Sequence, residues 1–378
     1  MSEDQEKARG LRNETVNDKI RAFYPKAQAL ILMSFVLVTP RDAALADWVA
    51  ARAAPFFQAA PEAIRVEPVS ADASFRRYFR IFSPEGATRI LMDAPPDKED
   101  NHAFARVADL MTEAGVRAPR VEIADFDAGF LLLTDLGSAD YLGALRKTPD
   151  RADTLMRAAL ETLIRWQKST RAGTLPPYDE ALLRRELELF PEWFMTRRLR
   201  RPPDKEQRAA LDALFSVLVN AALAQPRVFT HRDFMPRNLM VLEDGAPGVL
   251  DFQDAVEGPL TYDVVSLFRD AFLSWEEEQE LDWVVRYWEQ ARSAGLPVRS
   301  DFGVFWQEYE WMGLQRHLKV LGIFCRLCYR DSKPRYLSDL PRFMQYARKT
   351  AERYSELTPL ARLFDTLENK AEETFLTF

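Results

Sequence analysis

The stretch "FTHRDFMPRNLMVLEDGAPGVLDFQDA", residues 229–255, constrains the fold of this chain more than any other feature. It places Asp233 and Asn238 in a short polar loop between two apolar runs, and Asp251 directly after the second run. The apolar runs "NLMVL" and "GVLDF", separated by turn residues, predict a hairpin. A loop followed by a hairpin is expected to bring the two carboxylates and the carboxamide to one side of the chain.

Two carboxylates and a carboxamide in this order suit phosphoryl transfer from ATP. One carboxylate orients the attacking hydroxyl and accepts its proton, and oxygen ligands hold Mg²⁺. We therefore predict that Asp233, Asn238 and Asp251 are catalytic, with Asn238 and Asp251 as the Mg²⁺ ligands. Arg232 and Arg237 flank the loop and are candidates for contacts with phosphates or with the carboxylates.

Other residues near this loop and in the C-terminal part are predicted to serve the structure rather than the chemistry. His231, one of three histidines in the chain, is expected to hydrogen-bond the loop backbone. Asp263 in "TYD" is expected to be a helix N-cap that packs the loop. Cys325 and Cys328 are expected to be small residues of a buried helix or strand, because one C-x-x-C pair cannot complete a four-ligand zinc site.

The spacing His-Arg-Asp, four residues, Asn and then Asp-Phe resembles the signature of the protein-kinase superfamily. Gln253 replaces the glycine of protein kinases, and "DAVEGPLTYDVVSLFRD" follows without a long segment ending in Ala-Pro-Glu. In these respects the chain resembles the aminoglycoside phosphotransferase family, the small-molecule branch of the kinase-like fold.

Several further segments narrow the resemblance. "DASFRRYFRI", "ILMDAPPDKED", "LLLTDLG" and "WMGLQRHLKVLGIFCRLCYRD" look like the anomeric sugar kinases that phosphorylate N-acetylmuramate and N-acetylglucosamine at C1. The similarity covers about residues 42–350. It implies an α+β, bilobal, protein-kinase-like fold, with a small mixed β/α N-terminal lobe and a larger, mainly helical C-terminal lobe. It also implies ATP and Mg²⁺ as cofactors, an amino-sugar acceptor and a role in bacterial peptidoglycan recycling.

The periodicity of apolar residues agrees with two lobes. Residues 65–136 run strand, strand, helix, strand, strand, and a further helix is predicted after Pro40. From about residue 137 the pattern is mainly helical. Long amphipathic helices are predicted at residues 153–170, 179–199 and 205–224.

We therefore divide the chain into an N-terminal extension over residues 1–41, a nucleotide-binding lobe over residues 42–136, and a catalytic and substrate lobe over residues 137–378. The extension is polar and then apolar, and no chemistry can be assigned to it. It is either a flexible extension or an upstream segment read through from an earlier start, with Met33 as an alternative start.

In the N-terminal lobe, the residues with which protein kinases hold ATP are absent. The segment "SADASFRRYFRI" has no glycine. Met92 stands where a strand lysine is expected, and Ala103 or its neighbours stand where the paired helix glutamate is expected. The absence of both the lysine and the glutamate is physically consistent, because either charge alone would be buried without a partner, at a cost in stability. Other groups must then meet the nucleotide. The candidates are Ser74 in a tight turn, the arginines Arg76, Arg77 and Arg80 at the phosphates, and backbone groups near Leu133 and Asp135 at adenine.

The C-terminal lobe offers aromatic faces that suit a sugar ring and cations that suit an anion such as the lactyl carboxylate of N-acetylmuramate. The same side chains also suit a helix core. The candidate substrate contacts are Arg237, Trp306, Tyr309, Trp311, Arg316 and His317, with Lys319 as a further cation. Two alternatives stay open: a kinase of the same fold for an aminoglycoside, choline or homoserine, and a kinase-like protein that binds without catalysing.

Composition restricts the partners. The net charge of -7 disfavours a general nucleic-acid-binding protein, which usually presents a basic face. The longest apolar run, residues 27–38, is shorter than the roughly 20 residues that span a bilayer. We expect a cytoplasmic monomer with a small-molecule substrate, without membrane insertion and without a nucleic-acid partner.

Overall fold

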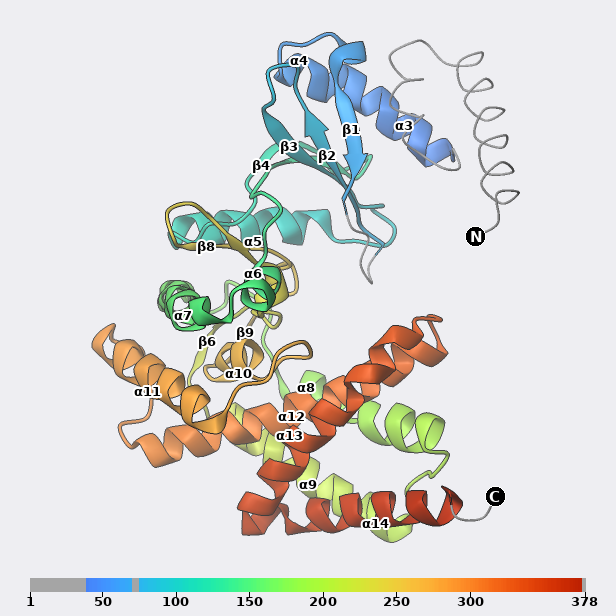
Figure 1. The fold of residues 1–378 in the computed structure, drawn as a ribbon, viewed down its shortest axis with the longest axis vertical. Coiled ribbons are helices and arrows are strands. Elements are labelled where there is room, and N and C mark those ends of the chain that lie inside the picture. Colours follow the sequence, from blue (N-terminus) through green and yellow to red (C-terminus); the bar gives the residue numbers. More distant parts are fainter. Residues whose placement is uncertain (1–38, 70–74, 376–378) are drawn as a thin grey trace. The chain divides into compact units, whose positions relative to one another are not determined.

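The computed structural model describes residues 39–69 and 75–375. Ser74, predicted to contact the nucleotide, and nearly all of the predicted N-terminal extension lie outside these ranges. The chain divides into two compact units, shown in Figure 1. The first contains the described residues up to Thr112 together with Ala118–Gly137, and the second contains Glu113–Arg117 and the residues from Ser138 onward.

The first unit is built on a five-stranded antiparallel sheet in the order β1-β2-β3-β5-β4. Its elements are α3 (Pro40–Trp48), η1 (Val49–Ala53), α4 (Ala54–Phe56), η2 (Pro61–Ala63), β1 (Arg65–Pro68), β2 (Arg77–Phe82), β3 (Thr88–Asp93), α5 (Asn101–Glu113), β4 (Val121–Asp125) and β5 (Phe130–Thr134). The predicted hairpin, helix and strand pair are confirmed as β2–β3, α5 and β4–β5. The edge strand β1 was not predicted as a separate strand.

The first helix, α3, begins where the sequence predicts. Thr39 and Asp42 form a capping box: the Thr39 side chain accepts the Asp42 N–H group, and the Asp42 carboxylate accepts the Thr39 N–H group at 2.7 Å. Pro40 occupies the first turn, where its missing N–H group has no cost. The apolar face of α3 packs with η1 against the sheet, where Ile81 and Leu91 are fully buried.

The second unit is mainly helical. Its helices are α6 (Tyr141–Lys147), η3 (Pro149–Arg151), α7 (Ala152–Lys168), α8 (Glu180–Leu187), η4 (Phe190–Arg198), α9 (Lys205–Leu223), η5 (Pro236–Asn238), α10 (Tyr262–Phe268), α11 (Glu277–Ser293), α12 (Phe302–Tyr329), η6 (Pro334–Asp339), α13 (Leu340–Arg353), η7 (Ser355–Leu357) and α14 (Thr358–Phe375). Its strands form two short antiparallel pairs, β6 (Arg227–Thr230) with β9 (Val256–Pro259), and β7 (Leu239–Val241) with β8 (Pro247–Val249).

The predicted helices and hairpin of this unit are present, with one correction. The helix predicted over residues 179–199 is not a single α-helix, because α8 ends at Leu187 and a π-helical segment, η4, follows. Pro191 lies in the first turn of η4 and has no N–H group for an α-helical bond. The strand β9 was not predicted. It pairs with β6 and thereby fixes the two ends of residues 231–255 beside one another.

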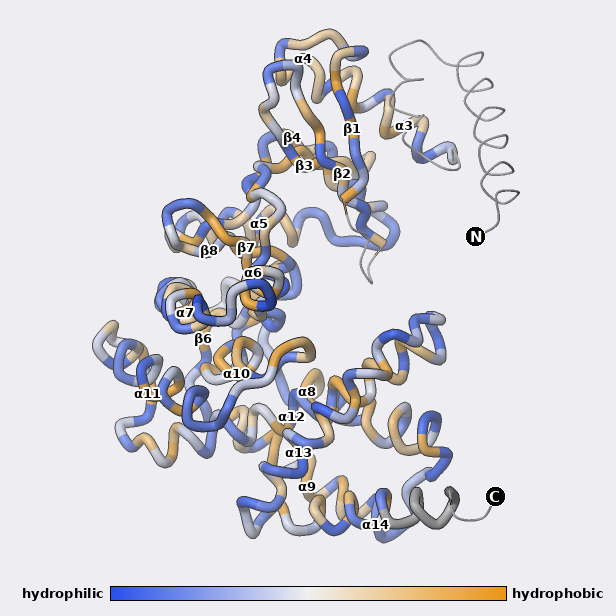
Figure 2. Tube along the Cα trace, viewed as in Figure 1, coloured by the Kyte–Doolittle hydropathy of each residue, from blue (hydrophilic) through white to orange (hydrophobic). Residues whose placement is uncertain are grey.

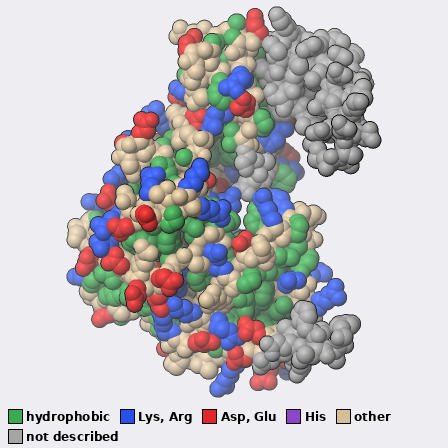
Figure 3. Space-filling view, in the orientation of Figure 1, with side chains coloured by type: hydrophobic (Ala, Val, Ile, Leu, Met, Phe, Trp, Pro, Cys, Tyr) green, Lys and Arg blue, Asp and Glu red, His purple; other side chains and the backbone are tan. Residues whose placement is uncertain are grey.

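Helix α12 runs through the core of the second unit and packs against η4, α13, α10 and α9. Helix α10, mainly hydrophobic in Figure 2, is buried along its whole length. On the face of this unit seen in Figure 3, acidic and basic side chains are interspersed rather than sorted by sign. Among the described helices, including α12 with 28 residues, none combines the length and hydrophobicity needed to cross a membrane.

Candidate active site

The predicted catalytic residues converge around the loop between β6 and β7. Asn238, the last residue of η5, donates its side-chain N–H groups to the backbone oxygen of Asp233 at 2.9 Å and to the carboxylate of Asp251 at 3.4 Å. Asp251 lies just beyond β8, the return strand of the hairpin. The loop and the hairpin thus bring all three side chains to one place.

The backbone at this site is strained at two positions. Arg232 and Asp251 have φ angles of 76° and 63°, in the left-handed region that residues with a side chain rarely adopt. Such conformations persist where the surroundings impose them. At Arg232 the backbone N–H group donates to Asp263 at 2.9 Å, and the guanidinium donates to Glu186 at 2.7 Å. Arg232 therefore holds the loop in place.

His231 bonds the loop backbone, as predicted. Its Nδ1 accepts the N–H group of Asp233 at 3.2 Å. The side chain is fully buried, and burial lowers the pKa of His231 to about 4. A neutral imidazole that accepts a backbone N–H group is neither a base nor a cation at neutral pH.

The prediction that Asp263 is a helix N-cap is wrong. Thr261 occupies the N-cap position of α10, and Asp263 lies in the first helical turn. Its carboxylate accepts the N–H groups of His231 at 2.6 Å and of Arg232 at 2.9 Å. Asp263 thus fixes the start of the catalytic loop to α10. Burial raises the pKa of Asp263 to about 7, although both N–H donors act to lower it.

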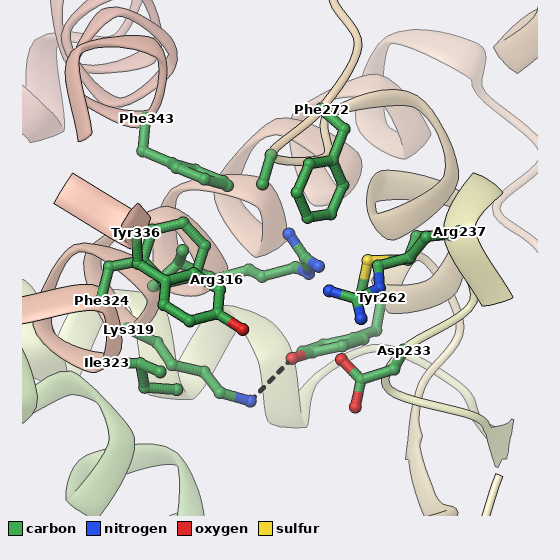
Figure 4. A pocket seen from close by; sticks show the side chains of 13 residues that line it. Asp233, Arg237, Tyr262, Phe272, Arg316, Lys319, Ile323, Phe324, Tyr336 and Phe343 are labelled. Carbon is green, nitrogen blue, oxygen red and sulfur yellow. Dashed lines mark hydrogen bonds between the residues drawn. The ribbon is translucent and has the colours of Figure 1, made fainter. Parts of the chain in front are cut away.

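A cavity of about 130 Å³ opens beside Asp233 within the second unit. Three basic side chains, Arg237, Arg316 and Lys319, line it together with this one carboxylate. Figure 4 shows Arg316 and Lys319 reaching from α12, and Arg237 from the catalytic loop, toward the same space. The cavity is therefore suited to an anionic or neutral group rather than to a cation.

Aromatic rings form much of the remaining wall of this cavity. They are Phe272, Phe324, Tyr336, Phe343 and Tyr262. Phe272 is held by Asp270, whose carboxylate accepts the backbone N–H groups of Phe272 at 2.9 Å and of Leu273 at 2.8 Å. Asp270 is almost completely buried, and burial raises its pKa to about 6. Rings of this kind suit the apolar surface of a sugar or of a substituent on it.

Glu186 of α8 joins the catalytic loop to α12. Its carboxylate lies 2.9 Å from Nζ of Lys319, accepts the Arg232 guanidinium, and also bonds the hydroxyl of Tyr178. Burial alone would raise the pKa of Glu186, but the charges of Lys319 and Arg232 lower it to about 2. Lys319 also donates to the hydroxyl of Tyr262 at 3.0 Å. Its ammonium thus has partners in the protein.

Four of the predicted substrate contacts do not line this cavity. The Tyr309 hydroxyl donates to Glu280 at 2.7 Å, and Trp306 stacks on the Tyr309 ring. Trp311 meets Tyr354 edge to face, and His317 is fully buried beside Tyr346 and Phe343. In the second unit these side chains belong to the packing of α12. The other two predicted contacts, Arg237 and Arg316, do line the cavity.

The arginines predicted at the phosphates each form an ion pair within the first unit. Arg77 bonds Asp42 at 2.7 Å and Asp93 at 2.8 Å, which ties α3 to β3. Arg80 bonds Asp135 at 2.7 Å. Burial raises the pKa of Asp135, but Arg80 and the Gly137 N–H group outweigh burial and hold it below its ordinary value.

The third of these arginines, Arg76, pairs with a residue that the sequence did not single out. Its guanidinium lies 2.9 Å from the carboxylate of Glu99, and both side chains are largely buried. Glu99 precedes α5 and also accepts the Phe75 N–H group at 3.1 Å. Met92 is fully buried in β3, and Leu133 is buried in β5. An arginine–glutamate pair thus joins the segments before β2 and α5, although the expected lysine and glutamate positions lack charges.

The donor set around Asp251 suits Mg²⁺. A carboxylate and a carboxamide lie within 3.4 Å of one another, and Gln253 also donates to Asp251 at 2.8 Å. Among the described residues, no three His, Cys, Asp or Glu side chains gather in a group that could hold a metal. Mg²⁺ in phosphoryl-transfer enzymes commonly has one or two protein ligands and completes its shell with phosphates and water. Asn238 and Asp251 fit that role.

The cavity residues of α12 share a periodicity that sequence reasoning missed. Arg316, Lys319, Val320, Ile323 and Phe324 recur at intervals of three and four residues, so they form one stripe along a helix. The stripe was visible in "WMGLQRHLKVLGIFCRLCYRD". The cavity residues Tyr262, Phe272, Tyr336 and Phe343 come from separate elements, and no local pattern marked them.

Comparison with known proteins places this site in context. Residues 65–302 match the phosphotransferase enzyme family. Over 307 residues the chain is 50% identical to the N-acetylmuramate/N-acetylglucosamine kinase of Pseudomonas aeruginosa, covering 81% of this chain and 89% of the relative. Over 312 residues it is 48% identical to the N-acetylmuramate/N-acetylglucosamine kinase of Neisseria meningitidis, covering 82% and 92%.

Solved structures show the fold at much lower identity. An ethanolamine kinase from Plasmodium vivax superposes with a TM-score of 0.60 at 12% identity, covering 85% of this chain and 94% of that chain. This similarity shows a kinase-like fold, with a small mixed N-terminal unit and a larger helical one, as predicted.

Proposed function

The chain belongs to the phosphotransferase enzyme family, and from this premise we propose that it is an ATP-dependent kinase for the anomeric C1 hydroxyl of N-acetylmuramate and N-acetylglucosamine. The high identity to relatives that bear this name over most of both chains supports the acceptor. The one structural observation that carries the proposal is the composition of the cavity beside Asp233.

That cavity distinguishes between classes of acceptor. Choline and aminoglycosides are cations, and their sites need acidic side chains. Here Arg237, Arg316 and Lys319 face a single carboxylate, Asp233, so a cationic acceptor would meet like charges. A neutral or acidic amino sugar avoids this repulsion and can pack its apolar surface on the aromatic wall.

In the proposed reaction the C1 hydroxyl oxygen attacks the γ-phosphorus of ATP. The new oxygen–phosphorus bond forms as the bond to the bridging oxygen breaks, and ADP leaves. Asp233 orients the hydroxyl and accepts its proton. The anomeric hydroxyl of a reducing sugar is more acidic than an ordinary alcohol, so a carboxylate is an adequate base. Positioning is the larger part of its contribution.

Asn238 and Asp251 would hold Mg²⁺, which neutralises negative charge on the phosphates when bound. Arg232 supports the loop through Glu186 rather than serving as a phosphate ligand. In the first unit, we assign the charge role of the kinase lysine–glutamate pair to Arg76 and Glu99, whose ion pair supports this choice. Arg80 with Asp135, and the backbone near Leu133, are the proposed neighbours of the rest of the nucleotide.

The proposed setting is the cytoplasm, where ATP is present, and the proposed role is the recycling of amino sugars from peptidoglycan. The active form in this proposal is a monomer, because the catalytic residues and the acceptor cavity are all supplied by the second unit of one chain.

Two measurements test the function together. ADP release is measured with N-acetylmuramate, N-acetylglucosamine, kanamycin, choline and homoserine, and turnover is expected with the two amino sugars. Phosphorus NMR of the product is expected to show an acid-labile phosphate coupled to H1. A product phosphorylated only at the 6-hydroxyl would refute the anomeric assignment. Binding of Mg–ATP without turnover of any acceptor would instead indicate a protein that binds without catalysing.

A further inference from the structure

The cavity beside Asp233 is smaller than the pockets that enclose whole drug-sized ligands. Its volume is about 130 Å³, whereas pockets that enclose drug-sized ligands measure about 300 Å³ or more. One substituent of the acceptor can therefore enter it while the ring stays outside. The walls supply aromatic rings from Phe272 and Phe343 together with the head group of Arg316 (Figure 4).

Arg316 is a buried cation of this cavity, and no ion pair with a described residue compensates its charge. Its side chain is 4% exposed. Its hydrogen bond to the backbone oxygen of Arg269 is long, at 3.5 Å. Lys319 differs, because its ammonium lies 2.9 Å from the carboxylate of Glu186. A buried cation without a paired anion is costly to maintain, which favours a partner brought by the ligand.

Two buried carboxylates, Asp263 and Asp270, lie close enough to Arg316 for its charge to oppose the rise in their pKa, but neither forms an ion pair with it. Both oxygens of Asp263 accept backbone N–H groups of the catalytic loop. Asp270 accepts two N–H groups of the segment after α10 through Oδ1, and its Oδ2 has no hydrogen-bond partner among the described residues. Figure 4 shows the head groups of Arg316 and Arg237 directed toward one another. An anion between them would accept hydrogen bonds from both guanidinium groups.

We propose that Arg316 binds the carboxylate of the lactyl group of N-acetylmuramate and makes the acidic sugar the preferred acceptor over N-acetylglucosamine. This inference rests on the proposed function. The lactyl group joins a methyl to a carboxylate, which matches a small cavity with aromatic walls and a buried guanidinium. N-acetylglucosamine carries a hydroxyl at that position, so it leaves the guanidinium without an anion.

The experiment compares kcat and KM for N-acetylmuramate, its methyl ester and N-acetylglucosamine. The enzymes are the wild type, Arg316→Gln, Arg316→Lys and the control Arg330→Gln. Arg330 lies directly after α12 and pairs with Asp331 at the surface, so its loss removes an arginine outside the cavity. The ester keeps the lactyl group but replaces its negative charge with a methyl group. It therefore tests the contact on wild-type protein even where a variant fails to fold.

For the wild type, kcat/KM is expected to be about tenfold or more higher for N-acetylmuramate than for its ester, mainly through KM. Arg316→Gln should lower the ratio of kcat/KM for N-acetylmuramate to that for N-acetylglucosamine by about tenfold or more. Arg316→Lys should recover part of that loss, and Arg330→Gln should keep the wild-type ratio.

Three results overturn the inference. In the first, the wild type uses the acid and the ester equally well. In the second, Arg316→Gln lowers activity on both sugars by the same factor, which indicates a merely structural arginine. In either case the sugar kinase activity survives. In the third, the wild type phosphorylates neither sugar, and the proposed function fails together with this inference.

Discussion

The carboxylate of Asp263 accepts the backbone N–H group of His231 at 2.6 Å, and this bond fixes the start of the catalytic loop to α10. The same carboxylate accepts the N–H group of Arg232, whose φ of 76° requires support from its surroundings. The position of Asp233, one residue further on, therefore depends on a residue that does not line the cavity beside Asp233.

We predict that Asp263→Ala lowers kcat and thermal stability together. The buried N–H group of His231 and the partly buried N–H group of Arg232 lose their acceptor, at a cost of up to about 1–3 kcal/mol each. Asp263→Asn retains one acceptor oxygen and should lose less of both. The control is Asp282→Ala in α11, which removes an exposed surface carboxylate. Steady-state kinetics and thermal unfolding measure the effect. Wild-type kcat in Asp263→Ala would show that the loop does not depend on this anchor.

Substitutions of the two carboxylates that we propose to be catalytic should have different effects. Asp233→Asn removes the proton acceptor, so kcat should fall by about 10²–10⁴ while the affinity for Mg–ATP changes little. Asp251→Asn removes a charged ligand beside Asn238, so it should weaken Mg–ATP binding and raise the Mg²⁺ concentration that half-saturates the enzyme. Nucleotide titrations together with kinetics separate the outcomes. Identical losses in both variants would contradict the assignment of separate roles.

The catalytic loop could be predicted because its information is local. Asp233, Asn238 and Asp251 lie within one stretch whose apolar runs reveal the hairpin, and both the loop and the hairpin formed as expected. Strand β9 escaped prediction because "VEGP" has no apolar alternation, and only its pairing with β6 makes it a strand.

The cavity beside Asp233 could not be predicted in the same way. Tyr309 and Arg316 lie seven residues apart on one face of α12, a separation of about 10 Å along the axis. Periodicity identifies that face, but it does not say where along the helix its neighbours leave a space. At Tyr309 the neighbours are Glu280 and Arg269, which fill it. At Arg316 the neighbours leave a cavity.

Glu186 should contribute far more to stability than an exposed glutamate of the same helix. Removing one member of a buried ion pair leaves an uncompensated charge and costs about 3–5 kcal/mol. Glu186→Gln strands both Lys319 and Arg232 in this way. The control is Glu180→Gln, also in α8, which breaks an exposed pair with Arg184 worth at most about 1 kcal/mol. Denaturant unfolding at neutral pH compares the two. Equal losses of stability in the two variants would show that the ion pairs of Glu186 with Lys319 and Arg232 contribute no more than an exposed pair.

Alanine substitutions at two glycines of α12 should change the stability of the protein in opposite directions. A Cβ on Gly322 would lie 2.4 Å from the backbone of Leu189, so α12 and the segment before η4 must separate. Gly322→Ala should therefore cost about 1–3 kcal/mol. A Cβ on Gly313 would meet Val265 at 3.4 Å, an ordinary contact. Gly313→Ala should be neutral or stabilise the protein by up to about 1 kcal/mol, because alanine favours the helix. Equal melting temperatures for the two variants would contradict this close approach.

His317 should make the protein less stable as the pH falls below about 6.5. Burial, with the charges of Arg269 and Arg316, holds the pKa of His317 well below its ordinary value. Between that value and 6.5, the unfolded chain binds a proton that the folded protein excludes, so acid favours unfolding. Neither ring nitrogen has a well-aligned hydrogen bond among the described residues, although a contact with the Arg269 backbone opposes the lowering of the pKa. The ring packs on Tyr346 and Phe343, so phenylalanine retains most of its contacts. Unfolding free energies at pH 7.5 and 5.5 should show His317→Phe gaining about 1.4 kcal/mol over the wild type at the lower pH. This comparison cancels the titration of Asp263 and Asp270, which the two proteins share. If the difference in unfolding free energy between the two proteins is the same at both pH values, His317 binds a proton in the folded protein with an ordinary pKa.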